Sequence, residues 1–252
     1  MNKPRNSLIT IGAGAGLAVL GKGGAAHYVE IDDNAFLMDC GEGAAGWLSY
    51  LDVLHKIKYI FISHLHSDHI SGLFPVIQNM FLAGRKEPLQ IFLPEAGIKP
   101  LSLMQETVYL ANRRPSMFSM SYHPIKKSVL IDCNNFSISA WESDHFKYDI
   151  KDYAVDEIEA FGFTINTNGQ KLIYTGDVST IDCFKDELVP SAVLLCEAMH
   201  IDTAAIVNVA LDIGLKKVIF THSDPVKSQQ LEDYCINCDI AVMAKDGLEF
   251  VW

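Results

Sequence analysis

The chain of 252 residues has few basic side chains and no long apolar run. No uninterrupted apolar stretch reaches about 18 residues, so no membrane-spanning helix and no membrane partner are expected. Lys and Arg number 20 against 31 Asp and Glu, which gives a formal net charge of −11. An acidic surface repels phosphate backbones and disfavours a large nucleic-acid footprint, but a bound metal ion can reverse the local field around a small anionic substrate.

Paired cysteine motifs, linkers and repeats are also missing. The six cysteines are scattered, and Cys235 and Cys238 form a lone C-x-x-C without the second pair that a structural zinc site needs. We expect reduced, buried thiols. No repeat, linker or charge block divides the sequence, which predicts one domain over residues 1–252. Three glycines interrupt the apolar stretch near the N-terminus, and this favours a cytoplasmic protein over one with a secretory leader.

Short β-rich runs alternate with helical stretches along the whole sequence. Strands outnumber helices by about two to one, which predicts an α+β fold with two sheets packed face to face and helices outside. Strands are expected at 8–11, 27–31, 35–39, 59–63, 89–93, 136–141, 161–165, 171–175, 193–197, 217–221 and 248–252, and helices at 44–56, 69–82, 101–112, 203–213 and 226–234. In the fourth helix, Asp202 is placed to cap the start and Gly214 to close the end.

The most informative segment follows the apolar run that ends at Ser63. Four side chains that can bind a metal, His64, His66, Asp68 and His69, occur within six residues, and a helix is expected to begin at once. On an extended or turning backbone His64 and His66 project to the same side, and the following turn aims Asp68 and His69 at a second point nearby. Such a group is costly to hold together without a cation. The segment therefore predicts a metal site.

Further candidate ligands lie at the ends of later strands. His145 follows the strand 136–141, Asp177 follows the strand 171–175, and His222 ends the strand 217–221. Loops at strand ends collect functional side chains on a rigid scaffold. His123 is an alternative to His145, which is preferred because it directly follows a strand.

These motifs together resemble the metallo-β-lactamase fold superfamily of metal-dependent hydrolases, and within it the ribonuclease Z-like and small phosphodiesterase branch. His64-x-His66-x-Asp68-His69 matches the signature motif of that superfamily. The segments 11–14, 37–43 and 244–248 resemble its opening turn, the turn before the signature and a common closing segment. The likeness runs from about residue 8 to the end of the sequence.

The resemblance implies a four-layer αβ/βα sandwich in which two mixed β-sheets are flanked by helices. It also implies two divalent metal ions, zinc by expectation, with manganese or iron as alternatives. By this likeness His64, His66 and His145 would hold the first ion, Asp68, His69 and His222 would hold the second, and Asp177 would bridge both. Asp39 would fix the metal loop through hydrogen bonds.

The expected chemistry is hydrolysis by a metal-bridging hydroxide, with a phosphodiester as first choice because two cations suit an in-line displacement at phosphorus. Asp68 would accept a proton or orient the nucleophile, and His200, paired with Glu197, is the candidate general acid. The match of Glu197 and His200 to the family is partial. The alternative is that Glu197 is a strand-end hydrogen-bond acceptor and His200 a helix cap.

One difference from ribonuclease Z limits the expected class of substrate. That family inserts a long arm that grips tRNA, whereas here only 32 positions separate His145 from Asp177. This interval carries acidic side chains in place of a basic, glycine-rich arm: Asp149, Asp152, Asp156, Glu157 and Glu159. An acidic segment repels a polynucleotide backbone. We therefore expect a small or short phosphodiester, and extended nucleic acid is disfavoured as a partner.

Other functions stay open on the same ligand set. A lactonase or a thioesterase similar to glyoxalase II is the main alternative, followed by a tRNA 3′-processing endonuclease and a non-catalytic metal scaffold. Relatives suggested by the resemblance are often dimers, so a homodimer is included among the expectations.

Overall fold

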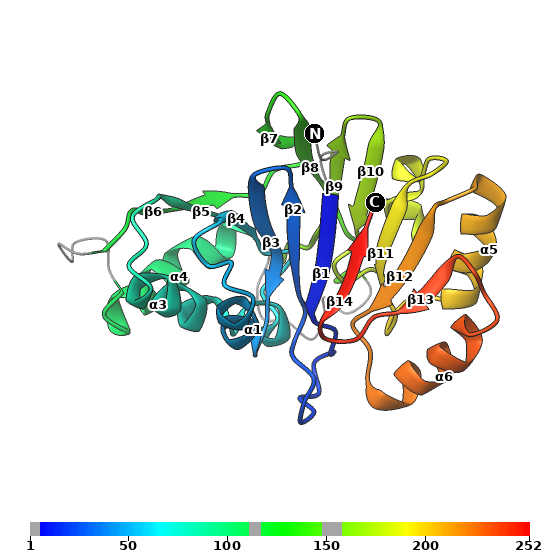
Figure 1. Ribbon diagram of the computed structural model, residues 1–252, viewed down its shortest axis with the longest axis horizontal. Helices are drawn as coiled ribbons and strands as arrows, with labels where there is room; N and C mark the ends of the chain where they lie inside the picture. The colour runs from blue at the N-terminus through cyan, green and yellow to red at the C-terminus, as the bar shows by residue number, and fades with distance from the viewer. Residues whose placement is uncertain (1–5, 111–116, 148–157) are drawn as a thin grey trace. The chain divides into compact units, whose positions relative to one another are not determined.

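The computed structural model describes residues 6–110, 117–147 and 158–252 (Figure 1). The chain forms two compact units, the first from residues 1–125 with 246–251, and the second from residues 126–245 with Trp252. We refer to them as unit 1 and unit 2. Each contains one seven-stranded sheet. The single domain expected over residues 1–252 stays a prediction.

The sheet of unit 1 is mixed, in the order β14-β1-β2-β3-β4-β5-β6. Neighbouring strands from β14 to β3 are antiparallel, and those from β3 to β6 are parallel. The strands are β1 (Asn6–Gly12), β2 (Ala26–Ile31), β3 (Asn34–Cys40), β4 (Ile57–Phe61), β5 (Leu89–Leu93), β6 (Met120–Pro124) and β14 (Leu248–Val251). The parallel half of this sheet carries the candidate metal loop, because that loop follows β4.

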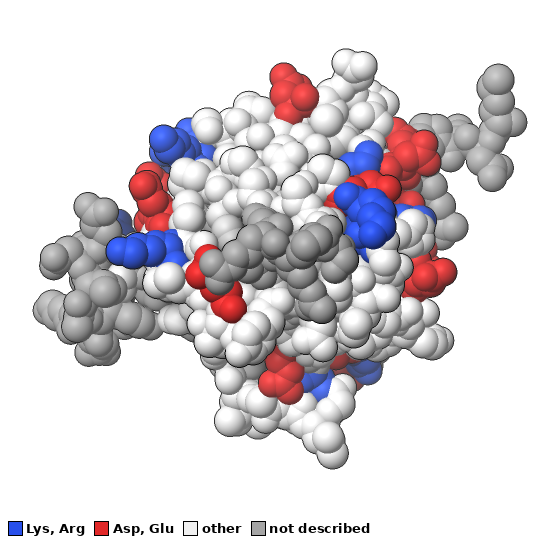
Figure 2. All heavy atoms as spheres, turned by 90° about the vertical axis from the view of Figure 1, so that its left-hand side faces the viewer, with Lys and Arg blue, Asp and Glu red and all other residues white. Residues whose placement is uncertain are grey.

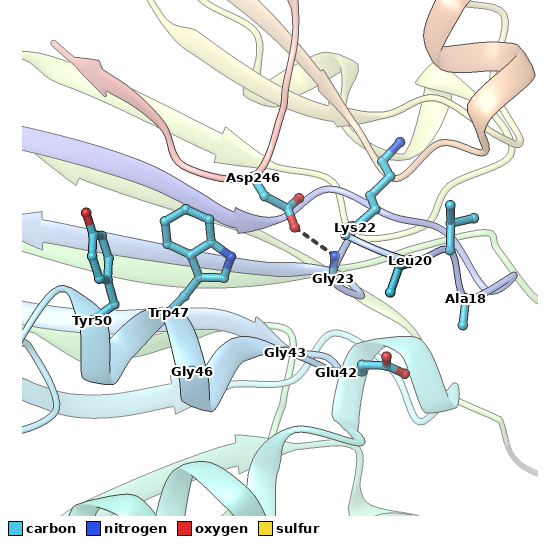
Figure 3. Close-up of a pocket in the computed structure, with 12 residues that line it drawn as sticks. Ala18, Leu20, Lys22, Gly23, Glu42, Gly43, Gly46, Trp47, Tyr50 and Asp246 are labelled. Carbon is cyan, nitrogen blue, oxygen red and sulfur yellow. Dashed lines mark hydrogen bonds between the residues drawn. The ribbon is translucent and has the colours of Figure 1, made fainter.

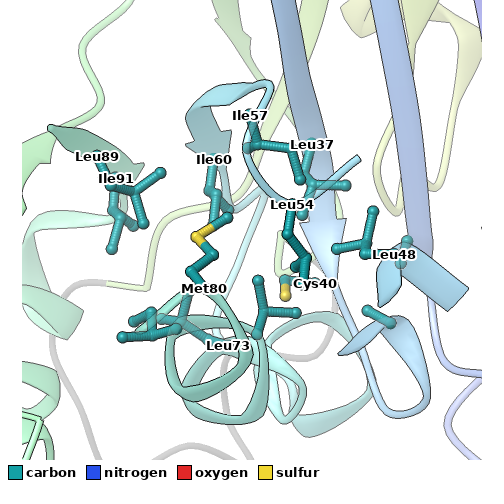
Figure 4. Close-up of a cluster of buried hydrophobic side chains, with 14 of the residues drawn as sticks. Leu37, Cys40, Leu48, Leu54, Ile57, Ile60, Leu73, Met80, Leu89 and Ile91 are labelled. Atoms are coloured by element: carbon teal, nitrogen blue, oxygen red, sulfur yellow. The ribbon is translucent and has the colours of Figure 1, made fainter. Parts of the chain in front are cut away.

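The helices of unit 1 are α1 (Ala44–Tyr50), α2 (Ser67–Ile70), α3 (Leu73–Leu82) and α4 (Glu95–Thr107). Apolar side chains of α1 and α3 interlock with those of the strands, as Leu48, Met80 and Ile60 show (Figure 4). All three are fully buried. Removing such a side chain would cost about 2–5 kcal/mol, because the cavity left behind collapses only in part.

The helix expected over 69–82 is interrupted at Gly72. A Cβ atom at that position would lie 2.0 Å from the carbonyl oxygen of Gly41, and the Gly72 N–H donates to the Cys40 carbonyl oxygen at 2.8 Å. This contact with the end of β3 separates α2 from α3. The helix expected over 44–56 also stops early, at Tyr50, and Asp52 adopts a left-handed conformation with φ 54°.

The sheet of unit 2 is also mixed, in the order β13-β12-β11-β10-β9-β8-β7. Its strands are β7 (Val129–Asp132), β8 (Phe136–Glu142), β9 (Phe161–Thr167), β10 (Gln170–Tyr174), β11 (Val193–Glu197), β12 (Lys217–Thr221) and β13 (Ala241–Met243). The helices are α5 (Thr203–Ile213) and α6 (Pro225–Cys235), with two 3₁₀ turns, η2 (Ile181–Cys183) and η3 (Lys185–Glu187). Side chains of α5 and α6 pack with β11 and β12 in one buried cluster.

The predicted α+β class, with two mixed sheets flanked by helices, is confirmed. The caps expected for α5 are present too, since Asp202 accepts hydrogen bonds from Ala204 and Ala205 and Gly214 is left-handed with φ 80°. Three short strands, β6, β7 and β13, were not expected. The six cysteines are all free thiols, two of them buried (Cys40 and Cys196) and four half-buried. Within the described residues no helix combines the length and apolarity needed to cross a membrane.

Candidate metal centre

In unit 1 the candidate ligands form one compact loop, residues 63–69, directly after β4. We call it the histidine loop. His64 and His69 are fully buried, and their ring centroids are 4.0 Å apart. The ring of His66 lies 4.6 Å from that of His64. The Nε2 atom of His69 is 3.6 Å from Oδ2 of Asp68. The four side chains predicted from the sequence are therefore together.

Asp39 fixes the histidine loop from the end of β3, as predicted. One carboxylate oxygen accepts the backbone N–H of Ser63 at 2.6 Å, and the other accepts the Ser63 hydroxyl at 2.8 Å. The second oxygen also lies 2.7 Å from Nδ1 of His69. Because an ionised carboxylate only accepts hydrogen bonds, Nδ1 carries the ring proton and Nε2 of His69 is the nitrogen that can ligate. Metal-binding histidines are commonly oriented in this way.

Glycines, which have no side chain, let the histidine loop approach the neighbouring turns closely. A Cβ atom on Gly41 would lie 2.1 Å from the carbonyl oxygen of Asp68, and one on Gly24 would lie 2.5 Å from the same oxygen. No side chain fits in either gap, since real Cβ atoms do not approach backbone so closely. The glycines that flank β2 and β3 thus position the loop by their lack of a side chain.

In unit 2 the directions of the strands bring the candidate residues together. β8 and β10 are both antiparallel to β9, and β10, β11 and β12 are parallel to one another. The carboxyl ends of β8, β10, β11 and β12 therefore meet at one edge of the sheet. The residues at these ends or shortly after them are His145, Asp177, Glu197 with His200, and His222. We call them the strand-end cluster.

Asp177 lies at the centre of the strand-end cluster. Its carboxylate is 2% exposed. Oδ1 is 3.4 Å from Nδ1 of His222, and Oδ2 is 3.8 Å from both Nε2 of His145 and Nδ1 of His200. One buried carboxylate thus faces three imidazoles. The potential ligating atoms of Asp177, His200 and His222 all lie within 4.8 Å of one another, so His200 is close enough to share an ion with them, a role that sequence analysis did not consider.

Glu197 and His200 form a close pair at the end of β11. Nδ1 of His200 is 3.4 Å from Oε2 of Glu197. Glu197 also accepts the backbone N–H groups of Met199, at 2.6 Å, and of His200. The contact with Glu197 raises the pKa of His200 against the opposing effect of burial. Burial alone would raise the pKa of Glu197, but its contacts with His200 and His222 outweigh that effect and lower it.

The strand-end interpretation of Glu197 is confirmed, and the role of the pair as a general acid stays a prediction. Glu197 is a strand-end hydrogen-bond acceptor and contacts His200 as well. The helix-cap interpretation of His200 is wrong, because Asp202 supplies the cap of α5.

Two residues that sequence analysis missed support the strand-end cluster. The Ser143 hydroxyl donates to the carbonyl oxygen of Asp177, and it accepts the backbone N–H of His145. Asp144 accepts the N–H of Ser179 at 2.8 Å. The signal was present in the sequence, because a Ser-Asp pair immediately before a candidate ligand at a strand end supplies an acceptor and a donor for loop backbone.

His123, the alternative to His145, lies elsewhere. It is on β6 in unit 1, stacks on Phe92 with ring centroids 5.0 Å apart, and its Nε2 is 2.8 Å from the Ser121 hydroxyl oxygen. His145 instead adjoins Asp177 in the strand-end cluster. The geometry within each unit favours His145.

Both clusters fit divalent metal ions by their donor chemistry. Each combines imidazole nitrogens with at least one carboxylate, a set that suits zinc, manganese and iron. Each also has the supporting contacts that orient ligands, from Asp39 in unit 1 and from Ser143 in unit 2. The histidine loop belongs to unit 1, and the strand-end cluster belongs to unit 2.

Comparison with known proteins decides the family. The sequence profile of a family described as Anti-Pycsar protein Apyc1 matches residues 6–196 of the chain. The chain belongs to the Apyc1 family. The matched region of this Apyc1 family member includes the whole histidine loop and, in unit 2, His145 and Asp177.

Curated relatives carry a different name. Ribonuclease Z of Methanococcus aeolicus is 31% identical over 142 residues, which are 55% of this chain and 43% of that protein. Ribonuclease Z of Ignicoccus hospitalis is 29% identical over 179 residues, 67% of this chain and 52% of that protein. The chain spans about half the length of the curated relatives it matches. The name ribonuclease Z describes those relatives, and the match over part of their length does not give the substrate of this chain.

Solved structures agree on the fold. Human tRNase Z, short form, has a TM-score of 0.76 at 21% identity and covers 97% of this chain and 98% of its own. The metallo-β-lactamase fold protein YhfI from Bacillus subtilis also has a TM-score of 0.76, at 16% identity, with 98% and 100% coverage. A diphosphatase of the PhnP family has a TM-score of 0.71 at 18% identity, with 98% and 97% coverage. The Apyc1 family member therefore has the metallo-β-lactamase fold.

These findings confirm the resemblance to the ribonuclease Z-like branch of that superfamily. They do not support the expectation that extended nucleic acid is disfavoured as a partner, because the curated relatives are ribonucleases. Four of the five acidic side chains behind that expectation lie within residues 148–157, outside the described residues. The homodimer stays a prediction.

Proposed function

We propose that this Apyc1 family member is a metal-dependent phosphodiesterase that hydrolyses a small or short phosphodiester with two divalent ions, zinc by expectation. The observation that carries the proposal is the contact of Asp39 with His69, buried and 2.7 Å long, which leaves Nε2 of the ring as its ligating atom. A buried carboxylate behind a histidine is the usual support of a metal ligand.

The proposal assigns the ligands as the family resemblance does. His64, His66 and His145 hold one ion, Asp68, His69 and His222 hold the other, and Asp177 serves both. Joining the histidine loop with the strand-end cluster is part of the proposal, supported by family membership and by the donor chemistry of each cluster. Bound ions supply Lewis acidity that activates water and stabilises charge on phosphate oxygens.

The protein's own residues manage the protons. Asp68 accepts the proton that the attacking water loses, or orients that water. His200 donates a proton to the leaving oxygen. Because Nδ1 of His200 faces Glu197, the donating atom is Nε2. Glu197 favours the protonated ring, which an acid needs before it can donate. His200 is 40% exposed, so a substrate can reach it.

The test is hydrolysis by the purified protein, loaded with zinc or manganese, of bis-p-nitrophenyl phosphate, a dinucleotide and a nucleoside cyclic phosphate. A lactone and S-lactoylglutathione test the lactonase and thioesterase alternatives in parallel. We expect phosphodiester turnover that EDTA abolishes and added metal restores. Turnover of the thioester or lactone alone would replace the proposal, and bound metal without any turnover would favour a scaffold.

A second candidate is an endonuclease that cleaves RNA, favoured by the likeness to ribonuclease Z. On the face drawn in Figure 2, the described Lys and Arg side chains lie singly beside Asp and Glu and form no continuous basic patch. Polynucleotide binding usually needs such a patch. A precursor tRNA substrate separates the two candidates. Cleavage at a single site, faster than any small phosphodiester, would establish the endonuclease.

A further inference from the structure

The serine directly before the first candidate ligand places one hydroxyl between two polar partners. The Oγ atom of Ser63 lies 2.8 Å from Oδ2 of Asp39 and 3.0 Å from Nδ1 of His64. All three residues are fully buried, so bulk water does not compete for these contacts. The hydroxyl has a single proton and therefore donates it to only one of the two partners.

The carboxylate decides the direction of these hydrogen bonds. An ionised carboxylate only accepts, so the Ser63 hydroxyl donates its proton to Asp39. The lone pairs of the Ser63 oxygen then face His64, and a hydrogen bond at 3.0 Å requires a proton on Nδ1. In the opposite arrangement two acceptor oxygens would face each other at 2.8 Å and repel. The contacts therefore leave Nε2 of His64 as its ligating nitrogen.

His69 is oriented by the same carboxylate without an intermediate. Its Nδ1 lies 2.7 Å from Oδ2 of Asp39 but 3.5 Å from the Ser63 hydroxyl oxygen, so the carboxylate is the acceptor. Oδ2 thus accepts from the ring of His69 directly, and it also accepts from the serine that serves His64. One buried oxygen therefore determines which nitrogen is protonated in two histidine rings.

The backbone around Asp39 holds the carboxylate in this position. Asp39 is left-handed, with φ 58°, a conformation that a residue other than glycine keeps only where its surroundings enforce it. Backbone hydrogen bonds tie the end of β3 to the connection between β1 and β2. The Gly41 N–H donates to the Ala25 carbonyl oxygen at 2.9 Å, and the Gly24 N–H donates to that of Glu42 at 3.1 Å.

The connection between β1 and β2 is itself fixed by Asp246, in the segment before β14. The Asp246 carboxylate accepts the N–H of Ala13 at 2.9 Å and that of Gly23 at 2.7 Å (Figure 3). A Cβ atom on Gly23 would lie 2.9 Å from the Glu42 carbonyl oxygen, so the connection directly contacts the turn after β3. These contacts do not involve the side chain of Ser63. We therefore expect the carboxylate to keep its place when the hydroxyl is removed.

We propose that Ser63 is a positioning residue that passes the orienting effect of Asp39 on to His64, an arrangement that we call the serine relay. The proposal rests on the proposed function, in which His64 belongs to one ion and His69 to the other. The two ions then depend on one carboxylate by unequal routes. Loss of the hydroxyl should weaken the binding of one ion, whereas loss of the carboxylate should weaken the binding of both.

The ring tautomers can be measured on the metal-free protein, apart from hydrolysis. Long-range ¹H–¹⁵N correlation at a pH where the rings are neutral distinguishes a proton on Nδ1 from one on Nε2. His64→Gln and His69→Gln assign the signals. We expect the Nδ1–H form for both rings. Ser63→Ala should shift only His64 toward the Nε2–H form, because the Nδ1 proton loses this acceptor.

Metal binding provides the second readout. Competition with a chromophoric chelator gives the affinity for each zinc ion. Ser63→Ala should weaken one ion by about 10- to 100-fold and leave the other within about twofold, and Asp39→Asn should weaken both. Ser63→Thr keeps a hydroxyl and should restore the affinity. Ser121→Ala removes a hydroxyl whose oxygen is 2.8 Å from the His123 ring, outside the histidine loop, so it is the matched control and should change neither.

A merely structural role of the hydroxyl would give a different pattern. Ser63→Ala retains the backbone N–H that donates to Oδ1 of Asp39 at 2.6 Å, so the histidine loop keeps this anchor. Equal weakening of both ions, with the tautomer of His64 unchanged, would overturn the serine relay. Unchanged affinity for both ions would overturn it as well. Should Ser63→Thr fail to fold, the tautomers of the wild type and of Ser63→Ala still decide.

The outcomes also separate this proposal from the proposed function. The expected tautomers and the selective loss of one ion, in a protein that hydrolyses no phosphodiester, would retain the serine relay and reject the function. Phosphodiester turnover by a wild-type protein in which neutral His64 carries its proton on Nε2 would retain the function and reject the serine relay.

Discussion

The two ligand clusters are built in opposite ways. The histidine loop takes its four candidate ligands from six consecutive residues, and a single buried carboxylate, Asp39, holds it in place. The strand-end cluster takes its residues from the ends of four strands, and Asp177 at its centre meets His145, His200 and His222 only because these strands end at one edge. The first cluster depends on a local turn, whereas the second depends on the topology of a whole sheet.

The largest effect should come from the centre of the strand-end cluster. Asp177→Asn removes the charge that the proposal assigns to both ions, so we expect hydrolysis of bis-p-nitrophenyl phosphate to fall by about 10³-fold or more. Bound metal, measured by elemental analysis, should fall with it. Asp182→Asn, an exposed carboxylate in the same unit, is the control. Full activity of Asp177→Asn would show that the strand-end cluster is not part of the active site.

A second change asks whether His200 donates a proton or holds a metal. If it is the general acid, His200→Gln should slow cleavage of a dinucleotide by about 10²-fold, because an alkoxide leaves poorly without a proton. A p-nitrophenyl ester should be affected far less, since its leaving group needs no proton. Metal content should stay unchanged, whereas His222→Gln should lower it. Metal loss in His200→Gln would instead assign His200 as a ligand.

The third change tests the support of the histidine loop. The change is Asp39→Asn. The new side chain would present an N–H₂ group to Nδ1 of His69, so the ring tautomer would reverse and Nε2 would carry the proton. We expect metal affinity to fall by about 10- to 100-fold. A competition titration with a chelator measures this. Asp144→Asn is the counterpart in unit 2, where the hydrogen bonds go to Ser179 and Thr180, and its effect on affinity should be smaller.

The smallest effects should appear in stability. Gly41→Ala places a Cβ atom 2.1 Å from the Asp68 carbonyl oxygen, and we expect it to lower the free energy of unfolding by about 3 kcal/mol. Gly176 precedes Asp177 with φ 56°, and Gly176→Ala should cost only about 1–2 kcal/mol.

Gly46 within α1 provides the control for these two changes. A Cβ atom there meets nothing within 4 Å, so Gly46→Ala should stabilise by about 0.5–1 kcal/mol. Urea unfolding of all three variants ranks the effects. If Gly176→Ala lowered the free energy of unfolding more than Gly41→Ala, the histidine loop would not be packed more closely than the strand-end cluster.

Sequence reasoning succeeded where the signal is local. The histidine loop and the strand β11 at Val193–Glu197 were predicted as observed, because ligand spacing and β-branched runs need no partner to be recognised. The role of Asp39 was also predicted, through the family resemblance, and its hydrogen bonds to Ser63 and His69 confirm it.

Prediction failed where distant contacts decide. Gly72 divides the expected helix because of the end of β3, which no local pattern reveals. The strand β13 is only three residues long, and β6 contains Ser, His and Pro, so neither stands out from a loop. The contact of Ser143 with the Asp177 carbonyl oxygen likewise depends on the approach of two loops that are far apart in sequence.

The pairing of β14 with β1 has a consequence for biosynthesis. During synthesis β1 leaves the ribosome more than two hundred residues before its partner at Leu248–Val251 and before the Asp246 carboxylate. Until then one side of β1 lacks the partner it has in the finished sheet, and open strand edges invite aggregation. A nascent chain of this protein thus carries an open edge of β1 through the synthesis of more than two hundred further residues, until β14 pairs with it.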